Sequence, residues 1–109
     1  MNDCRINFQK MHAYEVAKAL AKHVHFASIQ DAELRDQARR ASKSAFLQLS
    51  EGLPNSSLAM RRKYFICARN SACEVAAAID LAVEIEGLEG DEMLRLAQEL
   101  TRIVHGLMR

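Results

Sequence analysis

Apolar residues recur every three or four positions over four stretches of the chain, the spacing that places them on one face of an α-helix. The pattern predicts helices over about residues 8–26, 31–51, 58–86 and 91–107. The third stretch holds no helix-breaking residue between Leu58 and Glu86, and a helix of that length spans about 43 Å at 1.5 Å per residue. The sequence therefore predicts four amphipathic helices.

Each predicted helix carries its own apolar seam. The seams are Met11, Ala13, Val16, Ala17, Leu20, Ala21 and Val24; Leu34, Ala38, Ala41, Ala45 and Leu49; Phe65, Ala68, Ala72, Val75, Ile79 and Ala82; and Met93, Leu96, Ala97, Leu100, Ile103, Val104 and Leu107. The second seam is mostly alanine. Small side chains let a neighbouring backbone approach closely, which is typical of a helix packed on more than one side.

Polar residues and glycines mark the ends of these helices. The candidate N-terminal caps are Ser28 or Asp31 for the second helix, Ser56 or Ser57 for the third and Asp91 for the fourth. Gly52 is expected to turn left-handed past the end of the second helix, before Leu53 and Pro54, which cannot continue it. Gly87 is expected to cap the third helix in the same way.

Short connections between four amphipathic helices are typical of an antiparallel up-and-down four-helix bundle. One proline and four glycines are too few turn residues for a β-sheet protein. The chain also shows no internal repeat and no change of composition that would mark a second domain. We therefore expect an all-α fold in which residues 1–109 form one domain.

The charge and cysteine content of the sequence indicate which cellular compartment and which partners to expect. The formal net charge is +1, from fifteen basic and fourteen acidic residues, so no global field attracts nucleic acid or an anionic membrane. No apolar run reaches the roughly 20 residues of a membrane span, and the first residues lack the apolar stretch of a signal peptide. Three cysteines, Cys4, Cys67 and Cys73, follow no metal or disulfide spacing. We expect a reduced cytoplasmic setting, with Cys67 and Cys73 as buried packing thiols.

The run Val75-Ala76-Ala77-Ala78-Ile79 is apolar over more of the helix circumference than a surface helix of a monomeric bundle needs. Alanine tolerates either environment. We nevertheless expect part of this run to face another copy of the chain, which predicts a homo-oligomer.

Four groups of residues together resemble a known family. They are Gln37-x-Arg39-Arg40-Ala41-x-x-Ser44, Ser50-Glu51-Gly52, Lys63-x-Phe65 and Ala68-Arg69-x-Ser71-x-x-Glu74. This pattern is similar to the bacterial four-helix bundle proteins first described as open reading frames in intervening sequences of 23S ribosomal RNA genes. The accessory proteins of diversity-generating retroelements, which assist a reverse transcriptase, resemble the same superfamily. The similarity covers residue 8 to about residue 107.

The resemblance implies a four-helix bundle protomer, commonly assembled as a homopentameric, ring-shaped barrel, with no enzymatic activity. In the retroelement members a basic surface is thought to bind nucleic acid and the reverse transcriptase. By position, the basic sites of the pattern are Arg39, Arg40, Lys63 and Arg69, and its acidic site is Glu51.

Basic residues gather at the end of the second predicted helix and the start of the third. They are Arg39, Arg40, Lys43, Arg61, Arg62, Lys63 and Arg69. Antiparallel packing would bring them toward one another, and a patch of this kind binds phosphates with strong salt dependence. The alternative is a solvated or intersubunit ion-paired face, because the interleaved aromatics of a single-strand stacking surface are missing.

The remaining polar candidates favour structural roles. Glu51 and Glu74 are expected to form structural ion pairs with Arg39, Arg40 or Arg69, within one bundle or between bundles. His12, His23, His25 and His105 show neither His-Glu-x-x-His nor Glu-x-x-His spacing, so we expect surface or cap positions. We expect no metal and no cofactor.

Three functional hypotheses follow from the sequence. The first is a non-enzymatic homo-oligomeric scaffold, expected as a homopentamer, that holds a partner protein or nucleic acid. The second is an RNA- or DNA-binding accessory protein that assists a reverse transcriptase. The third, a small bundle enzyme using metal or thiol chemistry, has the least support in the sequence.

Overall fold

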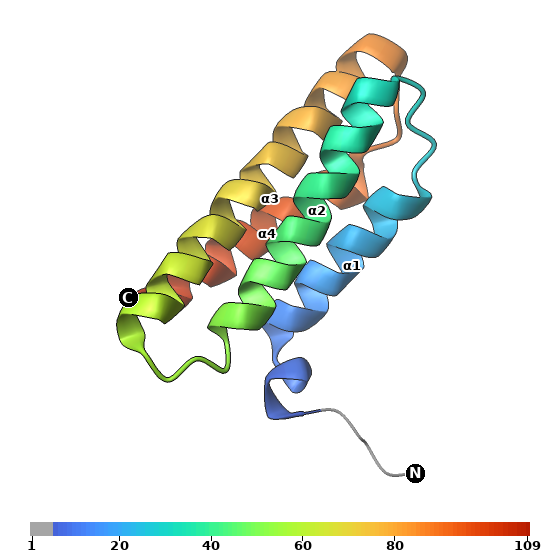
Figure 1. The fold of residues 1–109 in the computed structure, drawn as a ribbon. Coiled ribbons are helices and arrows are strands. Elements are labelled where there is room, and N and C mark those ends of the chain that lie inside the picture. Colours follow the sequence, from blue (N-terminus) through green and yellow to red (C-terminus); the bar gives the residue numbers. More distant parts are fainter. Residues whose placement is uncertain (1–5) are drawn as a thin grey trace, which may run out of the picture.

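The structure is a computed structural model that describes residues 6–109 (Figure 1). A short 3-10 helix, η1 (Asn7–Lys10), precedes four α-helices: α1 (His12–Phe26), α2 (Ala32–Gly52), α3 (Leu58–Glu86) and α4 (Asp91–Leu107). Within the described range the fold is all-α, as predicted, and the bounds of α3 and α4 are those predicted. Cys4 lies outside the described residues.

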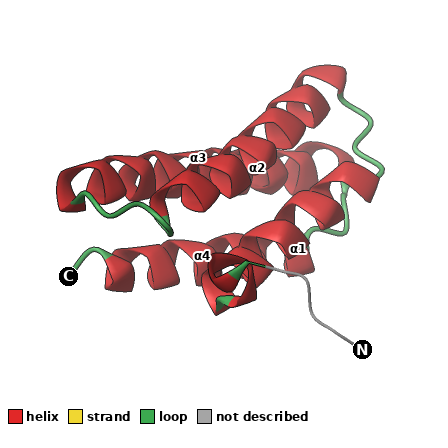
Figure 2. Cartoon of the chain, turned by 60° about the horizontal axis from the view of Figure 1, so that its bottom comes forward, coloured by secondary structure: helices red, strands yellow, loops and turns green. Residues whose placement is uncertain are grey.

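The helices lie side by side in two layers, α2 with α3 and α1 with α4 (Figure 2). Each helix packs against two others: α2 against α1 and α3, and α4 against α1 and α3. The connections from α1 to α2 and from α3 to α4 lie at one end of the molecule, and the connection from α2 to α3 lies at the other (Figure 1). None of the helices in residues 6–109 combines the length and apolar character that a membrane span needs.

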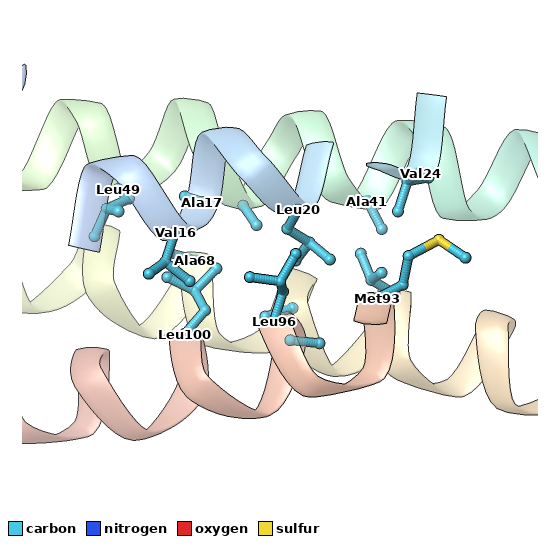
Figure 3. Packing of buried hydrophobic residues seen from close by; sticks show 14 of the residues in the cluster. Val16, Ala17, Leu20, Val24, Ala41, Leu49, Ala68, Met93, Leu96 and Leu100 are labelled. Atoms are coloured by element: carbon cyan, nitrogen blue, oxygen red, sulfur yellow. The ribbon is translucent and has the colours of Figure 1, made fainter. Parts of the chain in front are cut away.

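The four predicted seams meet in one core, except that Met11 of the first seam is exposed and Ala21 lies outside the core. Leu20, Leu49, Phe65, Ile79 and Leu100 are among its largest fully buried side chains. Figure 3 shows side chains of α1, α2, α3 and α4 pointing toward one another between the helices. Burying a large aliphatic side chain stabilises the folded state by about 1.5–3 kcal/mol. The shared core therefore holds the four helices together.

The first helix begins later than predicted. Residues 8–10 belong to η1, and Met11 has extended backbone angles (φ −75°, ψ 146°), so α1 starts at His12. The break lets Phe8 fold back until its ring meets the edge of Tyr14, with centroids 5.8 Å apart. In one continuous helix these two residues, six apart, would lie on different sides. Aromatic packing thus explains why the helix does not extend to Phe8.

Two of the alternative caps are now resolved. Asp31 caps α2 by accepting a hydrogen bond from the Leu34 N–H at 2.9 Å, and Ser57 caps α3 by accepting one from the Met60 N–H at 3.3 Å. The prediction that Asp91 caps α4 is wrong. Gly90 occupies the cap position without a side-chain bond, and Asp91 is the first residue of the helix, where its charge complements the helix dipole.

The two predicted glycine turns differ in outcome. Gly87 is left-handed (φ 68°) and ends α3, as predicted, with its N–H bonded to the Val83 carbonyl at 3.1 Å. Gly52 is instead a buried residue of α2 without a positive φ. A Cβ at Gly52 would lie 2.8 Å from Cε1 of Phe65 and 3.1 Å from Cβ of Tyr64. Gly52 is therefore required for close packing of α2 on α3 and not for a left-handed turn.

Candidate functional site

The predicted basic residues lie on the second half of α2 and the first half of α3. Arg40, Lys43, Arg62 and Lys63 are exposed, whereas Arg39, Arg61 and Arg69 are half-buried. Exposure therefore separates four side chains that are open to solvent from three that the fold partly covers.

Arg39 is engaged with the end of α1. Its guanidinium NH2 group donates a hydrogen bond to the backbone carbonyl of His25 at 3.2 Å, and its buried Nε has no partner among the described residues. A positive charge at a helix C-terminus is stabilised by the helix dipole. Arg39 therefore has a structural role, because it holds α2 against the end of α1.

Arg61 closes the connection between α2 and α3. Its NH1 group donates to the Leu53 carbonyl at 2.7 Å, and its guanidinium lies 5.1 Å from the centroid of the Phe65 ring. The first contact is a charge-assisted hydrogen bond and the second a cation–π interaction, and both are made within the chain. Arg61 is thus already engaged by its own chain.

The other basic residues point toward two sides of the molecule. Arg62 donates to the Met108 carbonyl at 3.3 Å, which places it on the α4 side of α3, and Arg69 follows two helical turns later on that side. Arg40 and Lys63 instead flank the contact between α2 and α3, which is marked by the hydrogen bond between Ser44 Oγ and Ser71 Oγ at 2.9 Å.

Arg40, Lys43 and Lys63 therefore lie on the outer side of α2 and α3, where the Ser44–Ser71 register places Lys63 about 18 Å from Arg40 along the helices at 1.5 Å per residue. The structure does not gather Arg62 and Arg69 onto the same surface. These three cations are exposed, and within the described chain none of them forms an ion pair. Arg40, Lys43 and Lys63 thus remain available to a phosphate.

Glu51 and Glu74 are exposed on the same outer side. Neither pairs with Arg39, Arg40 or Arg69 inside the described chain, where the ion pairs involve other residues. Pairing of these two carboxylates between copies of the chain stays a prediction.

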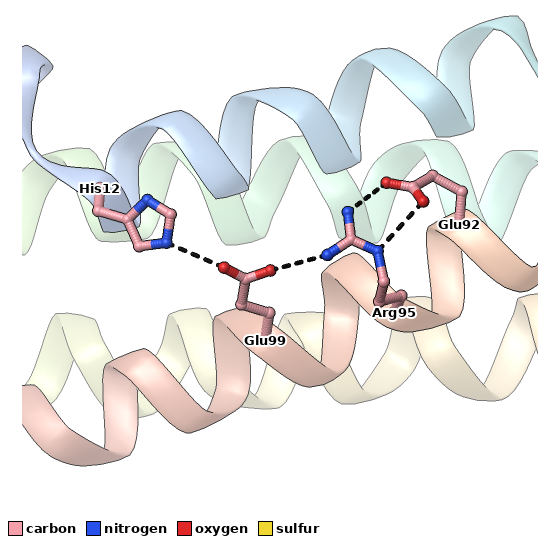
Figure 4. A network of polar contacts seen from close by, with 4 residues as sticks. All are labelled: His12, Glu92, Arg95 and Glu99. Atoms are coloured by element: carbon pink, nitrogen blue, oxygen red, sulfur yellow. Dashed lines mark hydrogen bonds and ion pairs between the residues drawn. The ribbon is translucent and has the colours of Figure 1, made fainter.

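A polar network that the sequence analysis did not single out links α1 to α4 (Figure 4). Arg95 donates to Glu92 at 3.1 Å through Nε and to Glu99 at 3.2 Å through NH1. Glu99 also accepts a hydrogen bond from Nε2 of His12 at 2.9 Å. The spacing of Glu92, Arg95 and Glu99 is a recognisable helical ion-pair pattern, but nothing in the sequence indicates that His12 joins it.

The network shifts the ionisation of two of its members. The hydrogen bond from Arg95 lowers the pKa of Glu92 below its ordinary value. The hydrogen bond to Glu92 raises the pKa of Arg95 above its ordinary value. Both side chains are exposed to solvent, so the network orders a surface and does not shelter either group from water.

The histidines and the described cysteines lie mostly at the surface. All four histidines are exposed, as predicted. The prediction of buried thiols is wrong for Cys73, which is exposed, and Cys67 is half-buried. Cys73 follows Ala72 of the seam by one residue, and one helical step turns its side chain outward. Among the described residues no group of three or more His, Cys, Asp or Glu side chains could hold a metal ion.

A cleft of about 560 Å³ lies between the end of α1 and the start of α4, away from Arg40, Lys43 and Lys63 on α2 and α3. Phe26, Ala19 and Met93 form apolar walls, and Glu89 and Glu92 lie at its polar border. The cleft is open to solvent, and Lys22 and His23 also line it.

Comparison with known proteins identifies the family. The curated proteins contain no match to this sequence. The sequence model of one family, described as 23S rRNA-intervening sequence protein, matches residues 9–109, which is nearly the whole chain and includes all four α-helices. The chain therefore belongs to the 23S rRNA-intervening sequence protein family.

Proposed function

We propose that the protein is a non-enzymatic homo-oligomer that acts as a scaffold or interaction module in the cytoplasm. The observation that carries this proposal is the exposure of large apolar side chains on the helices: Leu47 is 60% exposed, Leu81 48% and Ile85 58%. Removing apolar surface from water is favourable by about 25 cal/mol per Å². A second copy of the chain is always present to provide that burial.

We infer an antiparallel up-and-down arrangement of the four helices within each copy. Two hydrogen bonds support it: the Gln30 N–H at the start of α2 donates to Glu86 at the end of α3, and Arg62 at the start of α3 donates to the Met108 carbonyl beyond α4. For the assembly we propose a ring, with five copies as the expected number. This number rests on the resemblance to relatives that form homopentameric barrels.

Light scattering tests the oligomer directly. At micromolar concentration we expect a species several times heavier than the 12.3 kDa chain, and native mass spectrometry then counts the copies. A stable, fully folded 12.3 kDa species at that concentration would contradict the proposal.

A second candidate is a nucleic-acid-binding accessory protein of the retroelement type, which assists a reverse transcriptase. The exposure of Arg40, Lys43 and Lys63 without an ion pair in the described chain favours it. Cations of this kind can neutralise backbone phosphates, and the released counterions make binding fall steeply as salt rises.

Labelled single-stranded RNA and DNA at two salt concentrations test this candidate. We expect a Kd that weakens with salt, and a weaker salt dependence in the Arg40→Ala, Lys43→Ala variant because fewer phosphates are contacted. Lys22→Ala with Arg102→Ala is a matched control, since both residues are exposed on other helices. No binding at low salt would remove this candidate and leave the scaffold.

A further inference from the structure

A pocket of about 230 Å³ lies at the end of the bundle where α3 begins and α4 ends. Figure 1 shows this end of α4, marked by the C-terminus, beside the start of α3. Three arginines line the pocket: Arg61 and Arg62 on the first turns of α3, and Arg109 just after α4. The other lining residues are apolar; they are Leu58, Phe65, Leu107 and Met108. We name this site the arginine pocket.

The fold holds two of the three guanidinium groups in place. The NH1 group of Arg61 donates to the Leu53 carbonyl at 2.7 Å, and that of Arg62 donates to the Met108 carbonyl at 3.3 Å. A guanidinium presents several N–H donors in a rigid planar fork, and within the described chain each of these two groups uses one. The side chain of Arg109 forms no hydrogen bond to a described residue. The remaining donors are thus oriented by the fold and open to an oxyanion.

No carboxylate neutralises the arginine pocket within the described chain. None of its arginines forms an ion pair there, and no acidic residue lines it. Glu51 lies two residues before Leu53, whose carbonyl Arg61 binds, and its exposed side chain pairs with none of the three arginines. The first turn of α3, which carries the positive end of the helix dipole, also holds no acidic side chain. Three like charges therefore face one pocket without a counter-charge.

The charge of the arginine pocket indicates the kind of anion that it binds. Inside a nucleic-acid strand each phosphate carries one negative charge, whereas a terminal phosphate monoester carries about −1.5 to −2 near neutral pH. Arginine forks match phosphate oxygens in a bidentate geometry. Three converging arginines balance a dianion better than a single charge. The apolar residues around them bound a pocket, which admits the end of a molecule more readily than the middle of a strand.

We infer that the arginine pocket binds a dianionic phosphate through Arg61, Arg62 and Arg109. The phosphate is supplied either as inorganic phosphate or as the 5′-terminal phosphate of a nucleic-acid strand. This inference goes beyond the proposed function, because neither self-association nor the exposed cations on the outer side of α2 and α3 require this pocket.

Titration calorimetry with inorganic phosphate, at constant ionic strength and slightly alkaline pH, tests the pocket. The unchanged protein should bind phosphate saturably. Arg62→Gln and Arg109→Gln should each bind it about tenfold or more weakly, because each variant removes charge-assisted hydrogen bonds. The Arg109 side chain has no hydrogen-bond partner in the described chain, so Arg109→Gln should keep the fold even if Arg62→Gln does not. Circular dichroism checks that both variants retain their helices.

Arg40→Gln is the matched control, since it removes the same charge from another exposed arginine. Arg40 lies about 20 Å from Leu53 along α2 at 1.5 Å per residue, which exceeds the screening length of about 8 Å at physiological salt. The Kd of this variant for inorganic phosphate should therefore change less than about twofold.

Fluorescence polarisation with 3′-labelled single-stranded RNA identifies the source of the phosphate. If the strand end is the ligand, a 5′-phosphate should tighten binding about tenfold over a 5′-hydroxyl, and Arg109→Gln should abolish this gain while Arg40→Gln preserves it. If inorganic phosphate binds in the pocket and the 5′-phosphate adds nothing, the ligand is free phosphate.

Two results would overturn the inference. One is that neither inorganic phosphate nor a 5′-phosphate is bound; the other is that Arg62→Gln and Arg109→Gln bind phosphate as tightly as the unchanged protein. In both cases, binding of the 5′-hydroxyl strand that depends on Arg40 would still support the nucleic-acid candidate. Light scattering would still test the oligomer, so failure of the pocket is distinct from failure of the proposed function.

Discussion

A methyl group at Gly52 has no space, because Phe65 is buried and its ring lies 2.8 Å from where the Cβ would be. Gly52→Ala should therefore destabilise the protein by about 1–3 kcal/mol, the usual cost of overpacking a filled core. Urea unfolding followed by circular dichroism measures the change in the free energy of unfolding.

Gly106 provides the matched control for Gly52. It also lies in a helix, near the end of α4, but no atom would come within 4 Å of an added Cβ. Alanine is the better helix former, so Gly106→Ala should be neutral or stabilising by up to about 1 kcal/mol. Equal destabilisation by both variants would show that close packing at Phe65 is not the reason for glycine at position 52.

Glu92 should titrate below the ordinary range of a glutamate, because the Arg95 hydrogen bond lowers the pKa of its carboxyl group. A lowered folded-state pKa adds stability above the unfolded-state pKa, and that stability is lost as pH falls through the folded-state value. Carbon-detected NMR titration measures the pKa. In Arg95→Gln the pKa of Glu92 should return toward its ordinary value, and an unchanged pKa would contradict this assignment.

At the scale of the element, two adjacent serines allow a direct test of helix capping. Ser57 accepts the hydrogen bond from the Met60 N–H, whereas Ser56 is an exposed loop residue. Ser57→Ala should reduce the free energy of unfolding by about 1 kcal/mol, the typical value of a lost N-cap. Ser56→Ala should change it by less than about 0.5 kcal/mol. The reverse order in urea unfolding would place the cap at Ser56.

The helices were predictable from sequence where the apolar period alone determines them. The bounds of α3 and α4 follow from an uninterrupted seam that ends in a glycine or a loop. The start of α1 did not follow, because Phe8 continues the helical spacing and yet packs back on Tyr14. That contact forms only in the folded chain, so the spacing of apolar residues could not predict it.

The candidate site was predictable as a list of residues and less so as a surface. The sequence placed the basic residues on two neighbouring helix segments, and Arg40, Lys43 and Lys63 are exposed there. It could not separate them from Arg39 and Arg61, whose partners are the backbone carbonyls of His25 and Leu53. A carbonyl acceptor has no sequence signature, so such roles appear only in three dimensions.

At the scale of the whole molecule, the near-zero net charge conceals a separation of charge along α3. Its cations, Arg61, Arg62, Lys63 and Arg69, lie toward the connection with α2, and its acids, Glu74, Asp80, Glu84 and Glu86, lie toward the other end of the helix. A molecule of this kind does not attract a polyanion from a distance, but it has a preferred orientation toward a charged partner. The separation is therefore relevant to both the scaffold and the nucleic-acid hypotheses.

If exposed apolar residues are covered by other copies, folding stability should depend on protein concentration. If two folded chains associate and unfolded chains do not, a tenfold increase in protein concentration raises the free energy of unfolding by about 0.7 kcal/mol per chain. The midpoint of thermal unfolding should then rise by about 3–5 °C per tenfold concentration in a chain of this size. Scanning calorimetry over a roughly hundredfold concentration range measures this dependence.

The variant Leu47→Gln, Leu81→Gln should lose most of this concentration dependence, because both substitutions remove exposed apolar surface from α2 and α3 while leaving the buried core intact. Leu58→Gln is the control, since Leu58 is also exposed but lies at the start of α3, on a different side of the helix from Leu81. An unfolding midpoint of the unchanged protein that stays constant with concentration would mean that its folded state does not depend on other copies. In that case the exposed apolar residues would have to serve a different partner.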